Sequence, residues 1–86
     1  MIETRLLYYF LEVAKEKSFS KAAFNLHITQ PTLSKQIQDL EHYLNKKLFI
    51  RGKEITLTDD GLYLRDNALE IISLLEKTES NFSANE

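Results

Sequence analysis

Few side chains in this 86-residue sequence have the type and spacing that covalent or metal chemistry requires. Ser18 and Lys21 match the Ser-x-x-Lys spacing of some acylating hydrolases, but the companion motifs of those enzymes are missing. His27 and His42 lie far apart in the sequence, and there is no cysteine, so no set of metal ligands is formed. The sequence therefore predicts a protein that is not an enzyme and that binds no metal or cofactor.

Hydrogen-bonding side chains gather instead on one predicted helix, Gln30–Leu44. Its apolar residues recur at helical spacing and form one stripe, Leu33, Ile37, Leu40 and Leu44. The opposite face, including its flanks, carries Pro31, Thr32, Ser34, Lys35, Gln38 and His42. The acidic residues Asp39 and Glu41 come later. This order suits a helix that enters the major groove of DNA with its N-terminus first, because its positive dipole end then faces the phosphates.

The elements before this helix follow from breaks in the apolar pattern. Residues 3–17 contain no Gly or Pro and have apolar residues at helical spacing, which predicts a first helix. A short second helix is expected at Ser20–Leu26, since either serine before it can act as its N-cap. After a tight turn, Thr29 is the expected N-cap of the third helix, and Pro31 fits its first turn.

The periodicity changes after the third helix. Leu48–Arg51 and Glu54–Leu57 are short β-prone runs, separated by Gly52-Lys53. A glycine in the first place of a two-residue loop predicts a hairpin with a type II′ turn. Such a hairpin would place Arg51 and Lys53 at its tip.

A long helix is expected from Thr58, its N-cap, to about Ser80, with a frayed tail over 81–86. One of its stripes reads Leu64, Ala68, Ile71, Leu75, Thr78 and Phe82, and an adjacent one reads Leu62, Leu69 and Ile72. At 1.5 Å per residue this helix is roughly 30 Å long, which is too long for so small a domain to cover. We expect one face to pack on its own domain and the other on a partner.

The order of elements predicts a mainly α fold, a winged helix-turn-helix with a three-helix core and a small β-hairpin wing, followed by a long dimerisation helix. We expect the DNA-binding domain at residues 1–57 and the linker helix with its tail at 58–86. The formal net charge is −2, but residues 29–53 hold five basic and two acidic side chains. The acidity is concentrated in residues 54–86, so the chain can present a basic face to DNA.

Several strings in the chain resemble the LysR-type transcriptional regulators. They are Tyr9–Ala14, Ser18–Ala23, Leu26–Ile37 (LHITQPTLSKQI), Leu40-Glu41, Leu48-Phe49, Arg51, Leu57-Thr58 and Gly61, and the resemblance as a whole covers about residues 4–80. The wing departs from the family pattern: it is one residue shorter, and Glu54 stands where a basic residue is common. The family's effector-binding domain, which senses a small molecule in the full-length form, is absent, so we expect an excised or truncated DNA-binding part.

The resemblance implies a role for several residues. Base-edge contacts are implied for Gln30, Pro31, Thr32 and Lys35, and Lys35 stands where arginine is commoner in the family. Phosphate contacts are expected from Ser18, Ser20, Lys21, Ser34, Arg51 and Lys53. The resemblance also implies an antiparallel pairing of two long helices, for which we expect an interface of Leu64, Ala68, Ile71, Leu75 and Phe82.

The leading prediction is therefore a domain that binds an interrupted palindromic DNA site as a homodimer, with the third helix in the major groove and the wing on the backbone. The alternative is a winged helix that contacts another protein through its long helix, with which the acidic last third is compatible. No run of about 18 apolar residues suggests a membrane span, and residues 1–5 lack the long apolar run of a signal peptide. We expect a cytoplasmic protein without membrane contact.

Overall fold

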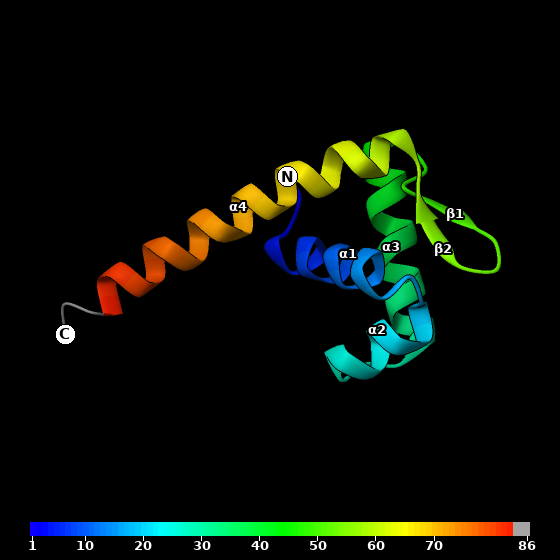
Figure 1. The fold of residues 1–86 in the computed structure, drawn as a ribbon, viewed down its shortest axis with the longest axis horizontal. Coiled ribbons are helices and arrows are strands. Elements are labelled where there is room, and N and C mark those ends of the chain that lie inside the picture. Colours follow the sequence, from blue (N-terminus) through cyan, green and yellow to red (C-terminus); the bar gives the residue numbers. More distant parts are fainter. Residues whose placement is uncertain (84–86) are drawn as a thin grey trace.

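The computed structural model describes residues 1–83 of the chain. In chain order its elements are α1 (Thr4–Glu16), α2 (Phe19–Leu26), α3 (Gln30–Leu44), β1 (Phe49–Arg51), β2 (Ile55–Leu57) and α4 (Asp59–Ser83) (Figure 1). The predicted order of three helices, a hairpin and a long helix is thus confirmed, and α3 has the predicted bounds. Within residues 1–83, no helix is both long and apolar enough to cross a membrane.

Side-chain caps begin the two helices of the helix-turn-helix. Ser18, and not Ser20, caps α2, because its Oγ accepts a hydrogen bond from the backbone N–H of Lys21 at 3.1 Å. Thr29 caps α3 through a bond from the backbone N–H of Thr32 at 3.4 Å, as predicted. His27 follows α2 in the left-handed conformation, with φ 59°, so the chain turns into α3 without a glycine.

The core lies where α1, α2 and α3 meet, and the wing adds to it. Phe10 of α1 and Leu33 and Ile37 of α3 have no exposed surface. Phe49 of β1 packs on Phe10 with ring centroids 5.2 Å apart, so the wing is attached to the three-helix body by an apolar contact. Figure 1 shows the hairpin beside α3, on the side away from the free end of α4.

The hairpin differs from the prediction in its turn. Arg51 pairs with Ile55 in the antiparallel register, which leaves the three residues 52–54 in the loop instead of two. Gly52 does not have the positive φ that a type II′ turn requires, so that prediction was wrong. A tertiary bond accompanies the observed register: the backbone N–H of Ile55 donates to the carbonyl oxygen of Lys17 at 3.2 Å and connects β2 to the end of α1.

The junction between the wing and α4 is closely packed. Thr58 is the N-cap of α4, as predicted, since its Oγ1 accepts from the backbone N–H of Gly61 at 3.0 Å. The same hydroxyl donates to the carbonyl oxygen of Lys47 at 2.7 Å. A Cβ at Gly61 would overlap the carbonyl oxygen of Leu48 and would come within 2.9 Å of Leu57 Cδ2. Glycine is therefore required here because α4 starts directly against the wing.

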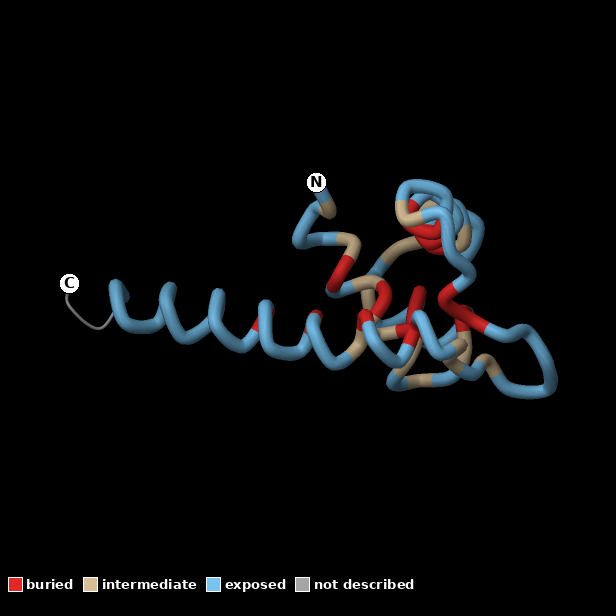
Figure 2. The backbone as a smooth tube through the Cα atoms, turned by 90° about the horizontal axis from the view of Figure 1, so that it is seen from above, coloured by how far each residue is buried: buried red, intermediate tan, exposed pale blue. Residues whose placement is uncertain are grey.

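The helix α4 packs on the body at one end and projects from it at the other. It has 25 residues, which correspond to about 37 Å at 1.5 Å per residue. Leu64, Ala68 and Ile72 of α4 belong to the core, whereas every residue from 73 to 83 is exposed (Figure 2). The helix continues past the predicted end at Ser80, so the fraying expected at 81–83 is wrong; the rest of that tail, 84–86, lies outside the described residues.

Candidate nucleic-acid interface

The N-terminal turns of α3 present the side chains for which base contacts were expected. Gln30, Pro31, Thr32 and Lys35 are all exposed in the first two turns of the helix. By helical periodicity Pro31, Thr32 and Lys35 lie away from Leu33 and its buried neighbours, whereas Gln30, the first residue of α3, lies above the buried face. Their contacts to bases stay a prediction.

Two of these side chains already have partners within α3. The hydroxyls of Thr29 and Thr32 lie 2.7 Å apart and share a hydrogen bond. The ammonium of Lys35 is 3.3 Å from Oδ1 of Asp39, one helical turn further on. A base therefore competes with Asp39 for the Lys35 ammonium, while Thr32 still offers its methyl group.

Arg51 does not lie at the tip of the hairpin, where the sequence placed it. It is the last residue of β1, and its guanidinium lies over the ring of Phe19 at 4.3 Å from the centroid, at the start of α2. Only Lys53 stands in the loop. The wing is thereby joined to the N-terminal turn of α2, where Ser20 and Lys21 are exposed.

A hollow of about 340 Å³ lies between α3 and β1, and Ser34 and Arg51 both line it. Ser34 is half-buried, and Gln38 lines the same hollow from α3. Two of the residues expected to contact phosphate thus meet at one site beside the helix that carries the base-contact candidates. Their phosphate contacts also stay a prediction.

Glu41 is a residue whose role the sequence reasoning missed. The sequence places it with Asp39 among the later acidic residues of α3, but only 6 % of it is exposed. Its Oε2 accepts a hydrogen bond from the backbone N–H of Leu48 at 2.7 Å, and its Oε1 lies 3.8 Å from Lys47 Nζ. The carboxylate therefore fixes the start of the wing to α3. The available signal was its position directly beside Leu40 on the apolar stripe.

Some of the basic side chains on this surface have no acidic partner. Lys35 and Lys47 are paired with carboxylates, whereas Lys21, Arg51 and Lys53 form no ion pair within residues 1–83. These three charges are free to attract phosphate, although Arg51 also stacks on an aromatic ring.

Within residues 1–83, no group of three His, Asp or Glu side chains could hold a metal ion.

The residues expected at a dimer interface fall into two groups. Leu64 and Ala68 are buried in the chain's own core, 8 % and 0 % exposed, and Leu64 also lines the groove described below. Ile71, Leu75 and Phe82 are exposed, and so is Leu74 between them. The apolar stripe in the sequence could not separate the buried group from the exposed group, because it does not show where α4 leaves the three-helix body.

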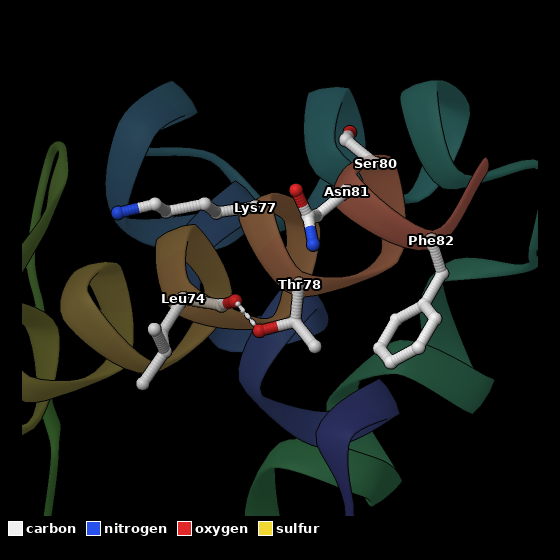
Figure 3. Close-up of a pocket in the computed structure, with 6 residues that line it drawn as sticks. All are labelled: Leu74, Lys77, Thr78, Ser80, Asn81 and Phe82. Atoms are coloured by element: carbon white, nitrogen blue, oxygen red, sulfur yellow. Dashed lines mark hydrogen bonds between the residues drawn. The ribbon is translucent and has the colours of Figure 1, made fainter. Parts of the chain in front are cut away.

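The exposed residues of α4 continue into an apolar groove of about 730 Å³. The groove is lined by Ile71, Leu74 and Leu75 of α4, by Met1, Ile2 and Leu7 at the N-terminal side, and by Tyr43 of α3. Figure 3 shows the outer end of this face, where Leu74, Thr78 and Phe82 point to the same side of the helix. The hydroxyl of Thr78 donates to the carbonyl oxygen of Leu74 at 2.7 Å, so its bonding capacity is used within the helix.

Comparison with known families agrees with the fold and with the strings quoted above. Residues 4–62 match the model of the bacterial regulatory helix-turn-helix proteins of the lysR family. The chain belongs to the lysR family. This confirms the resemblance seen in the sequence, and the matched residues include α1, α2, α3 and the wing, together with the start of α4.

Curated relatives in the lysR family are transcriptional regulators. An uncharacterized HTH-type transcriptional regulator from the ibpB-leuC intergenic region of Azotobacter vinelandii is 47 % identical over 70 residues, which are 80 % of this chain and 49 % of the relative. The regulator BenM of Acinetobacter baylyi is 40 % identical over 77 residues, 88 % of this chain and 25 % of BenM. The chain thus spans half or less of the length of these relatives.

A solved lysR-family structure has the same fold along nearly the whole chain. The crystal structure of the BenM DNA-binding domain in complex with catB site 1 DNA superposes with a TM-score of 0.93 at 38 % identity, covering 96 % of this chain and 93 % of that one. The predicted winged helix-turn-helix with a long C-terminal helix is therefore confirmed.

Proposed function

We propose that this chain is the DNA-binding part of a LysR-type transcriptional regulator and that it binds double-stranded DNA sequence-specifically as a homodimer. The observation that supports this most is the surface formed by the N-terminal half of α3, with its exposed amide and ammonium groups, beside a basic wing. The fold is that of the BenM domain whose crystal structure contains DNA. The chain would act as a regulator and not as an enzyme, in the cytoplasm, where bacterial DNA lies.

In the proposed complex, α3 enters the major groove with its N-terminus first. Gln30 and Lys35 would contact base edges, because an amide can pair with adenine in two places and an ammonium reaches guanine acceptors. Lys21, Arg51 and Lys53 would contact phosphates on either side of the groove. These contacts set affinity and register, whereas the α3 contacts set sequence preference.

The second copy would pack on the outer half of α4. The exposed residues Ile71, Leu74, Leu75 and Phe82 form an apolar face that the body leaves uncovered. An antiparallel pair of α4 helices would cover it and would place two α3 helices on half-sites related by twofold symmetry. In a full-length form, a further domain would bind a small-molecule effector.

A selection from random duplexes, followed by titration at about 50 and 200 mM salt, tests this proposal. We expect an interrupted palindrome and an affinity that falls steeply with salt. Gln30→Ala and Lys35→Ala should relax the sequence preference, whereas Arg51→Ala should weaken binding to all duplexes alike. Lys77→Ala, which removes an exposed charge from the outer part of α4, is the matched control.

Two results would contradict the proposal. If Gln30→Ala and Lys35→Ala left affinity and preference intact, α3 would not be the recognition helix. If the chain retained no duplex even at low salt, the outer half of α4 would be better explained as a surface for another protein.

A further inference from the structure

The recognition helix carries an acid in line with its base-contact candidates. Thr32, Lys35 and Asp39 follow one another at spacings of three and four, so they form one row along α3. Asp39 is exposed, and its Oδ1 lies 3.3 Å from Lys35 Nζ. An acid in this row meets either the base edges or the phosphates whenever α3 lies in a groove.

The ion pair makes the exposed surface of α3 electrically neutral. Lys35 and Asp39 are its only exposed charges when His42 is neutral, because Glu41 is buried. The neutral pair releases no counterions from DNA, so Lys35 adds little to the attraction between α3 and phosphate as long as it stays on Asp39. On a non-matching sequence, no base acceptor competes with Asp39 for Lys35, so the ion pair stays formed.

A matching sequence offers both members of the pair a new partner. The Lys35 ammonium can move to the O6 and N7 acceptors of guanine, and the Asp39 carboxylate can accept from the N4 amino group of cytosine. Without those groups, the carboxylate is left facing the negative phosphates. Asp39 therefore costs affinity on wrong sequences that it does not cost on the right one.

We infer that Asp39 is a specificity-determining residue, which suppresses binding to wrong sequences by holding Lys35 in a neutral pair. The inference rests on the proposed function, because it requires that α3 lies in the major groove. Asp39→Asn tests this inference with little change of shape, because the Asp39 side chain is half-exposed and asparagine has nearly the same size as aspartate.

The experiment measures Kd for a random-sequence duplex pool and for a duplex selected from that pool, at about 50 and 200 mM salt. With Asp39→Asn, Lys35 becomes free for a phosphate, and the slope of log K against log salt on the pool should steepen by about 0.9. Over this fourfold range of salt, that slope corresponds to about a 3.5-fold larger loss of affinity. The ratio of the affinity for the selected duplex to that for the pool should therefore fall, and by about 3.5-fold more at about 50 mM than at about 200 mM salt.

Asp66→Asn is the matched control, because Asp66 also forms an exposed ion pair, with Arg65 at 3.3 Å, but on α4. Asp66→Asn removes the same charge and should leave the ratio of the two affinities, for the selected duplex and for the pool, unchanged. Asp39→Glu keeps the charge and should also keep the wild-type ratio. Equal ratios for Asp39→Asn and Asp66→Asn would overturn the inference while leaving the proposed function intact. A wild-type chain that binds neither duplex would overturn both.

Discussion

Replacing Glu41 by alanine should detach the wing from α3. The Glu41 carboxylate is almost fully buried and accepts from the backbone N–H of Leu48 at 2.7 Å, and Leu48 itself is 1 % exposed. In Glu41→Ala this N–H loses a charged acceptor in a place that water does not easily reach. Hydrogen bonds to charged groups contribute about 1.5–3 kcal/mol. We expect the free energy of unfolding to fall by about 2–3 kcal/mol, and Tm by roughly 10–20 °C for a domain of this size.

Urea unfolding followed by circular dichroism measures this loss. Glu41→Gln keeps an oxygen acceptor with the same reach and should recover part of the stability, whereas Asp66→Ala, at an exposed ion pair, should change it by less than about 0.5 kcal/mol. Duplex binding provides a second measurement, because a displaced wing should lower the salt dependence and leave the sequence preference in place. If Glu41→Ala unfolded at the wild-type urea concentration, the carboxylate would not hold the wing and our reasoning would be refuted.

Three further predictions concern α4. Gly61→Ala should destabilise the chain by about 1–3 kcal/mol in thermal unfolding, because the new methyl group overlaps the wing backbone; a gain from the higher helix propensity of alanine would show that α4 can shift freely. Leu75→Glu should lower the dimer fraction in analytical ultracentrifugation, whereas Leu69→Glu, at an exposed leucine on another side of α4, should not; equal effects would contradict the proposed face. Partial burial and the nearby Glu76, which accepts from the Tyr8 hydroxyl at 3.3 Å, raise the pKa of Tyr8 above 10.0. The protonated hydroxyl therefore contributes to the stability of the fold below pH 10.0, and this contribution is lost as the pH rises through the higher pKa of the folded state. In an ultraviolet titration, with Tyr8→Phe to assign the signal, Glu76→Gln should lower this pKa; an unchanged value would mean that burial and the charge of Glu79 raise it without Glu76.

Local signals predicted most of the fold. The bounds of α3 could be predicted because Thr29 and Pro31 mark its start and the apolar stripe ends at Leu44. The N-cap Thr58 was found for the same reason, since a cap depends on neighbouring residues only. The turn of the hairpin was missed, because the bond from Ile55 to Lys17 connects residues that are distant in the sequence.

The residue types of the candidate site could be predicted from the sequence, but the contacts between the wing and the helices could not. That Pro31, Thr32 and Lys35 are exposed on α3 followed from helical periodicity. The contact of Arg51 with Phe19 and the bond from the Leu48 amide to Glu41 depend on how the wing packs against α2 and α3, and periodicity contains no information on that packing. The split of the α4 stripe into core and exposed parts likewise depends on the size of the body, which no single helix reveals.

The bond from the Ile55 amide to the Lys17 carbonyl also affects the thermodynamics of binding. Together with the contact between Phe10 and Phe49, it attaches the wing to the body at two points, so the conformational entropy of the hairpin is lost when the chain folds and not when it meets DNA. The Ile55 amide should accordingly exchange its hydrogen for deuterium as slowly as amides of the helical core, although it lies next to an exposed loop. A wing ordered in advance leaves more of the phosphate attraction available as net affinity.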